Sequence, residues 1–157
     1  MTRERELTVT PGNVVRFFSE EEAAQLVKLW ISTFSNGDKG LKDEQFLWHI
    51  FSGCVYPSVQ GDMALKQYSA QIGTEFIVLS NDRRVAFLTD KLPDSVSLSD
   101  YYVFPPNFAW TMAFTHEAGW LGPYFARHPK PEALDRANEA AVRKAIEADL
   151  ARKNGWA

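Results

Sequence analysis

Residues 75–89 have the sequence EFIVLSNDRRVAFLT. Two apolar runs, rich in β-branched and aromatic side chains, flank the turn-forming segment NDRR. This is the pattern of two antiparallel strands joined by a short connection. Because both runs are almost continuously apolar, we expect both faces of the two strands to be covered. These residues therefore predict the centre of an antiparallel sheet.

A second hairpin is predicted downstream. Residues 101–104 and 109–115 are strand-like, and they flank the turn formed by Pro105, Pro106 and Asn107. In residues 110–115 large apolar side chains alternate with smaller ones, which is typical of a half-buried strand. Upstream, residues 14–18 predict one more short strand.

Residues 19–34 predict a helix. Ser19 and Glu22 have the spacing of a capping box, and apolar side chains then recur three and four residues apart through Trp30 to Phe34. The sequence Asn36-Gly37 is expected to end this helix. The regular apolar stripe predicts that one face of the helix lies in the core.

Two further helices are expected in the first half of the chain. Residues 43–52 predict one that is apolar over more than one face, with Trp48 at the edge of its stripe. Either another element or a binding partner would have to cover that edge. Residues 62–71 predict a shorter helix with Ala64, Leu65 and Tyr68 directed inward.

The C-terminal third begins with a segment that is loop-like by composition and ends in a long helix. Residues 116–131 are rich in glycine and proline but also aromatic, so we expect a packed loop. The helix from Glu132 to about residue 153 is rich in alanine and has a thin apolar stripe, so it should dock lightly. We therefore expect a single α+β domain over residues 1–157, with N-terminal helices, an antiparallel sheet of two hairpins and a peripheral C-terminal helix over residues 130–154.

Composition excludes several classes of protein. The net charge of −3, without a basic cluster, argues against a nucleic-acid partner. The apolar runs are far shorter than the roughly twenty residues of a membrane helix, and the charged N-terminus does not resemble a secretory signal. A single cysteine, Cys54, excludes an internal disulfide and fits a reducing compartment. We expect a soluble cytoplasmic protein that does not bind a membrane.

The best catalytic or metal-binding candidates are His116 and Glu117, with His128 as a second metal ligand. Adjacent side chains on an extended chain point to opposite faces, so His116 and Glu117 reach one ion only if the backbone bends. We therefore expect no metal and no cofactor. Cys54 is expected to be a small core residue, because on one helix it would lie about 140° from His49.

Three motifs resemble a known family. FLWHIFS at residues 46–52, WTMAFTHE at residues 110–117 and GPYF at residues 122–125 are similar to a family of small bacterial proteins known only as a domain of unknown function. The similarity covers roughly residues 25–127 and leaves out the C-terminal helix. The resemblance implies a bacterial source and a shared fold, and it implies no activity, substrate or cofactor.

The excess of aromatic residues suggests a binding surface. Trp48, Trp120 and Tyr124 are the expected partner-binding anchors, with Asp43 and Glu44 on the acidic rim. The alternative is that these aromatic rings are core residues. The function that we expect is non-enzymatic protein binding, such as that of an immunity or antitoxin protein that blocks a basic toxin. The alternative is a small metal-dependent or hydrolytic enzyme centred on His116 and Glu117. The oligomeric state does not follow from the sequence.

Overall fold

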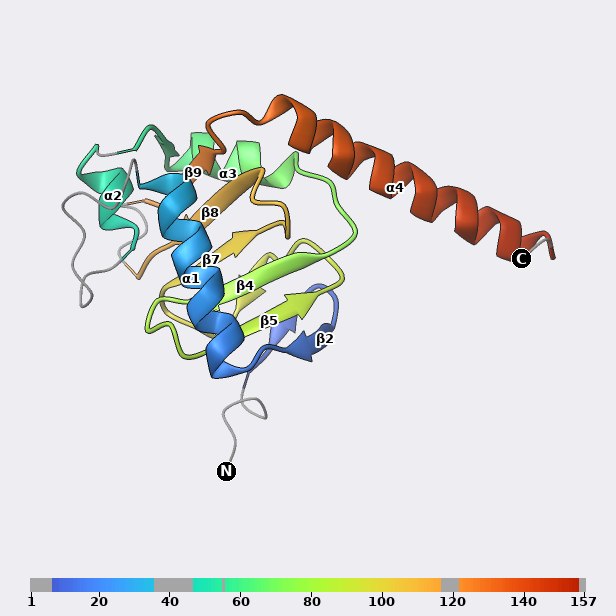
Figure 1. Ribbon diagram of the computed structural model, residues 1–157, viewed down its shortest axis with the longest axis horizontal. Helices are drawn as coiled ribbons and strands as arrows, with labels where there is room; N and C mark the ends of the chain where they lie inside the picture. The colour runs from blue at the N-terminus through green and yellow to red at the C-terminus, as the bar shows by residue number, and fades with distance from the viewer. Residues whose placement is uncertain (1–6, 36–46, 55, 117–121, 156–157) are drawn as a thin grey trace.

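The computed structural model describes residues 7–35, 47–54, 56–116 and 122–155 (Figure 1). Helices and strands both contribute, which confirms the α+β class. The helices are α1 (Glu20–Phe34), α2 (His49–Ser52), α3 (Asp62–Ser69) and α4 (Glu132–Lys153). The strands are β1 (Val9–Thr10), β2 (Val14–Phe17), β3 (Val59–Gln60), β4 (Phe76–Ser80), β5 (Ala86–Thr89), β6 (Ser95–Val96), β7 (Tyr101–Phe104), β8 (Trp110–Phe114) and β9 (Tyr124–Arg127).

Seven strands form an antiparallel sheet in the order β2-β5-β4-β7-β8-β9-β3, and β1 pairs separately with β6. The two predicted hairpins are β4–β5 and β7–β8, and they occupy the centre of the sheet. The sheet is larger than two hairpins because β2, β9 and β3 extend it. Strand β9 lies in the segment expected to be a loop. The glycines and prolines of that segment flank these four residues without interrupting their pairing with β8.

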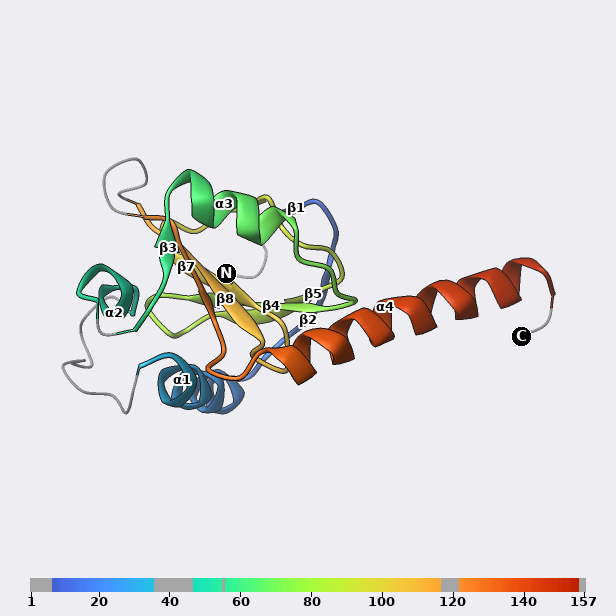
Figure 2. The ribbon, with the colours of Figure 1, turned by 90° about the horizontal axis from the view of Figure 1, so that it is seen from above.

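Helices cover both faces of the sheet, and Figure 2 shows α1 and α3 on opposite sides of it. In β4, Ile77 and Leu79 join the core cluster under α1, whereas Phe76 and Val78 join the cluster under α3. The prediction that β4 is covered on both faces is therefore confirmed. The prediction that β8 is only half-buried is wrong, because α1 and α2 also cover its second face.

Helix α1 has the predicted start and the predicted buried face. The Ser19 hydroxyl accepts a hydrogen bond from the Glu22 backbone N–H at 3.1 Å, and the Glu22 carboxylate accepts one from the Ser19 N–H at 2.8 Å. Its buried residues are Ala23, Val27, Trp30 and Phe34. The indole N–H of Trp30 donates to the Thr111 hydroxyl at 2.9 Å, which gives this polar side chain of β8 a partner inside the core.

Two helical predictions need correction. Of the helix expected over residues 43–52, the described part is only the single turn α2, preceded by a turn at Leu47 and Trp48, and residues 43–46 lie outside the described residues. In α3, Ala64 and Tyr68 are buried as predicted, but Leu65 is exposed. With 100° between successive residues, Leu65 lies outside the arc that Ala64 and Tyr68 direct at the sheet.

Candidate functional site

Polar side chains gather at one end of the sheet, which we call the sheet-end cluster: Asn81, Asp100, Tyr102 and His116, with the ring of Trp48 beside them. Antiparallel pairing brings them together. Ser80 at the end of β4 is opposite Tyr101 at the start of β7, and Tyr101 is opposite Phe114 near the end of β8. Residues that follow β4 or β8, or that precede β7, therefore meet at one edge of the fold.

Asp100 and His116 form a closely bonded pair within the sheet-end cluster. The carboxylate of Asp100 accepts a hydrogen bond from the His116 backbone N–H at 2.7 Å. His116 Nδ1 lies 2.8 Å from Oδ2 and 3.0 Å from Oδ1 of the same carboxylate. A carboxylate can only accept, so the Nδ1 proton points at Asp100. The side chain of His116 is 44% exposed whereas that of Asp100 is 7% exposed, so a buried anion orients an accessible imidazole.

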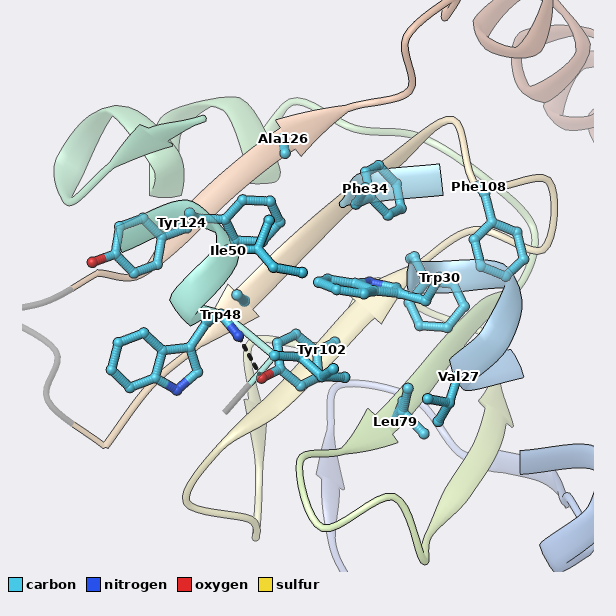
Figure 3. Close-up of a cluster of buried hydrophobic side chains, with 14 of the residues drawn as sticks. Val27, Trp30, Phe34, Trp48, Ile50, Leu79, Tyr102, Phe108, Tyr124 and Ala126 are labelled. Carbon is cyan, nitrogen blue, oxygen red and sulfur yellow. Dashed lines mark hydrogen bonds between the residues drawn. The ribbon is translucent and has the colours of Figure 1, made fainter. Parts of the chain in front are cut away.

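Tyr102 connects the same end of the sheet to the segment before α2 through hydrogen bonds of its hydroxyl. Its hydroxyl donates to Asn81 Oδ1 at 2.5 Å. The same hydroxyl accepts from the Trp48 backbone N–H at 3.0 Å, the bond drawn in Figure 3. Asn81 Oδ1 also accepts from the Leu47 N–H at 3.1 Å. Burial raises the pKa of Tyr102 well above its ordinary value of 10, so the phenol stays neutral and keeps its donor. These bonds fix where the chain enters α2.

Trp48 and Tyr124 are core residues, and the prediction that they form an exposed binding surface is wrong. Their exposed fractions are 1% and 2%. The two rings stack with centroids 6.1 Å apart, and His116 lies at 6.4 Å from the edge-on Trp48 ring. Gly122 has a φ of +85°, and a Cβ there would lie 3.0 Å from the Tyr124 ring, so a side chain at this position would be strained. The other predicted site residues, Asp43, Glu44, Glu117 and Trp120, lie outside the described residues.

The two histidines proposed as metal ligands lie at opposite ends of the sheet. His128 follows β9 and its N–H donates to the Ala109 carbonyl at the start of β8, whereas His116 follows the end of β8. Seven residues of extended chain separate those ends by roughly 20 Å, so one ion cannot bind both. Within the described ranges, no group of three or more potential ligands is close enough to hold a metal.

A pocket of about 560 Å³ opens beside α2. Its lining includes Phe51, Tyr56 and Tyr124, together with Cys54. Cys54 is exposed, not buried as expected, because it follows the end of α2 with a φ of +59°. Of the four polar residues in the sheet-end cluster, none lines this pocket. The pocket and the Asp100–His116 pair are therefore separate features.

Helix α4 leaves the rest of the fold, and Figures 1 and 2 show it extending away from the sheet in both views. Its 22 residues include none that is buried. Among the described residues, the contacts between this helix and the domain come from its first turns. Asn107 Nδ2 donates to the Leu134 carbonyl at 3.2 Å and to Asn138 Oδ1 at 3.1 Å, and Arg127 lies 3.5 Å from Asp135. Burial at this junction raises the pKa of Asp135.

Beyond Asn138 the helix carries apolar side chains that no other described element covers. Ile146 is 55% exposed and Leu150 is 52% exposed. With Val142 they are spaced by four residues, so the three lie within about 80° around the helix axis. We call Val142, Ile146 and Leu150 the α4 apolar row. Nowhere in the described part of the chain is a helix long and apolar enough to cross a membrane.

The fold and these sites define an α+β protein with a seven-stranded antiparallel sheet, a bonded Asp–His pair at one sheet end and a projecting helix. The chain belongs to the family of the domain of unknown function DUF4275, whose model matches residues 31–125. No curated protein and no solved structure matches the chain. The matched segment contains the sheet-end cluster but not α4, so family membership gives no information about the helix.

Proposed function

We propose that the protein is a non-enzymatic protein-binding domain and that α4 is its binding element. The observation that carries this proposal is a helix of 22 residues without one buried residue. Helices gain most of their stability in proteins from packing, and an isolated helix is marginal in water. An amphipathic helix that presents apolar side chains four residues apart is a common ligand for a groove on another protein.

The kind of binding that we propose is the blocking of a toxin, as in immunity and antitoxin proteins. This choice is an analogy of type, based on a small domain with mild acidity. The net charge of −3 favours association with a basic partner, so binding should slow as salt rises. Asp43 and Glu44, which were expected at the acidic rim of the aromatic surface, lie outside the described residues, and their role in binding stays a prediction.

Affinity capture with matched variants tests the role of α4. The double variant Ile146→Glu, Leu150→Glu places two charges in the α4 apolar row. The control, Ala141→Glu with Ala148→Glu, adds the same charge on the opposite side of the helix, where both alanines are exposed. We expect partners that the parent captures after cross-linking to be lost from the first variant and kept by the control. Equal recovery from all three proteins would contradict the proposal.

General acid–base catalysis at His116 is a second candidate function, and the Asp100–His116 geometry favours it. A buried carboxylate bonded to Nδ1 holds the imidazole in one orientation, and in the neutral ring Nε2 then accepts the proton. In this candidate His116 is the base of a small hydrolase, as in the alternative centred on His116 and Glu117. The carboxylate that orients His116 here is that of Asp100.

Turnover of chromogenic ester and phosphate-ester substrates tests this candidate. His116→Ala should abolish turnover, Asp100→Asn should lower it about 10²-fold or more, and His128→Ala, at the far end of the sheet, should leave it unchanged. If the parent protein turns over none of the substrates, or if His116→Ala keeps the parent's rate, His116 is not a catalytic base for this chemistry.

A further inference from the structure

The charges of α4 are divided between its two halves. Residues 132–142 carry three carboxylates and one cation, a net charge of −2, and residues 143–153 carry four cations and two carboxylates, a net charge of +2. The charged residues of the first half are Glu132, Asp135, Arg136 and Glu139, and those of the second half are Arg143, Lys144, Glu147, Asp149, Arg152 and Lys153.

Contacts inside the protein change this division but do not reverse it. Arg127 lies 3.5 Å from Asp135 and offsets one negative charge at the root of the helix. At the tip, Asp149 is paired within the helix, with Lys153 at 3.1 Å and with Arg152 at 3.4 Å. The root therefore stays acidic and the tip stays basic. The acidic root of one helix would therefore attract the basic tip of another copy.

This division selects one orientation for two copies of the helix. Side by side and parallel, two copies would bring acidic root to acidic root and basic tip to basic tip, which is unfavourable. In the antiparallel orientation each basic tip lies along the acidic root of the other copy. A twofold axis through the middle of the helix generates this arrangement, and Val142 lies close to that midpoint.

We propose that α4 binds α4 of a second copy of this chain in an antiparallel pair, with the α4 apolar row of each copy at the contact. This rests on the proposed function only in that α4 is the binding element, and it makes a second copy of the chain, instead of a toxin, the partner of that helix. The exposed Ile146 and Leu150 of one copy then pack over the first half of the other helix. Burying these side chains supplies the apolar contact, and the opposite charges set the direction.

Sedimentation with charge-reversed variants is the main test. Glu132→Lys with Glu139→Lys changes the first half from −2 to +2, and Lys144→Glu with Lys153→Glu changes the second half from +2 to −2. We expect the parent to reach twice 17.8 kDa as its concentration rises and each variant alone to stay at 17.8 kDa. An equimolar mixture should restore a dimer with one copy of each variant, because every contact is again between opposite charges.

Disulfide formation between introduced cysteines tests whether the two α4 helices pair antiparallel. In a Cys54→Ser background, Val142→Cys places the thiols near the twofold axis and should cross-link readily. Leu150→Cys should not, because in the antiparallel pair the two thiols are about 24 Å apart, far beyond disulfide reach. A parallel pair would cross-link through both positions, and that result would overturn the proposed orientation.

The outcomes separate this inference from the proposed function. In one outcome, the parent stays monomeric at every concentration, and the double variant Ile146→Glu, Leu150→Glu loses a captured partner. The assignment of a second copy as the partner is then wrong, and α4 binds a different protein. If the parent dimerises and that double variant dimerises equally well, the α4 apolar row is not the contact and the inference fails. Dimerisation by the parent and by the Ala141→Glu, Ala148→Glu control, but not by the double variant, is the result that we expect.

Discussion

Helices α1 and α4 are the two longest helices in the described part of the protein, and they differ in what stabilises them. Helix α1 has a capping box and four buried residues, and the indole N–H of its Trp30 donates a hydrogen bond to Thr111 of strand β8. Helix α4 is longer, has no side-chain cap at its start and buries none of its residues. The comparison teaches that a helical sequence pattern predicts a helix, whereas the width of its apolar stripe predicts whether that helix joins the core.

The largest expected effect is on α1. Trp30→Ala removes a fully buried ring and leaves the Thr111 hydroxyl without this donor, so the free energy of unfolding should fall by about 3–5 kcal/mol. The matched change in α4, Ile146→Ala, measured in dilute monomeric protein, should cost less than about 0.5 kcal/mol because the side chain is exposed in the single chain. Denaturant titration of both variants gives the two values. A loss below about 1 kcal/mol for Trp30→Ala would mean that α1 is not a core helix.

Proline substitutions compare the two helices through their backbones. Lys28 in α1 and Ala141 in α4 are both exposed mid-helix residues, so proline at either removes a hydrogen bond and costs about 3 kcal/mol locally. Lys28→Pro should destabilise the whole domain by that amount. Ala141→Pro should reduce the helical circular dichroism but shift the unfolding seen by tryptophan fluorescence by less than about 0.5 kcal/mol. Equal destabilisation by both variants would contradict the independence of α4.

Tyr102→Phe tests the sheet-end cluster with a smaller expected effect. The change removes the oxygen that accepts from the Trp48 N–H and the donor to Asn81, so two hydrogen bonds of the sheet-end cluster are lost beside a buried residue. The free energy of unfolding should fall by about 1–3 kcal/mol. Ser32→Ala, on the exposed side of α1, is the control and should change it by less than about 0.5 kcal/mol. Indistinguishable stabilities for the two variants would show that the Tyr102 bonds contribute nothing.

The smallest effect is a pH dependence at the start of α1. A hydrogen bond from Arg16 and then one from the Ser19 backbone lower the pKa of Glu22 from 4.5 to about 2. Because the folded pKa is the lower one, this contribution to stability is complete above pH 4.5 and disappears as the pH falls toward 2. The difference in unfolding free energy between the parent and Glu22→Gln should therefore shrink over that range. The difference in unfolding free energy between the parent and Arg16→Met should shrink over the same pH range. A difference that stays constant with pH, for either variant, would contradict this assignment.

The sequence predicted the parts of the fold that depend on local pattern. The capping box at Ser19, the two hairpins and the alanine-rich α4 all follow from spacing and turn residues, and all are present. Strand β9 was missed because the glycines and prolines around its four residues make the whole segment loop-like by composition, although these four residues pair with β8. The turn before α2 was missed because tertiary bonds from Tyr102 and Asn81 determine it.

The candidate site was predicted less well, since it depends on which strand ends meet. His116 was identified from its residue type, but its true partner, Asp100, was not. The signal was present in the second hairpin: pairing residues 101–104 with 110–114 puts the residue before the first strand next to those after the second. Trp48 and Tyr124 were expected to be exposed because composition cannot tell which aromatic rings stack on each other inside a core.

Amide hydrogen exchange of α4 and α1 in one experiment tests the central claim that α4 is stabilised from outside its own chain. In dilute protein, amides of residues 141–153 should exchange far faster than those of the buried face of α1, because α4 opens locally while α1 opens only with the domain. Raising the protein concentration should slow exchange in α4 alone. Protection of α4 that equals that of α1 in dilute protein and does not change with concentration would contradict the account.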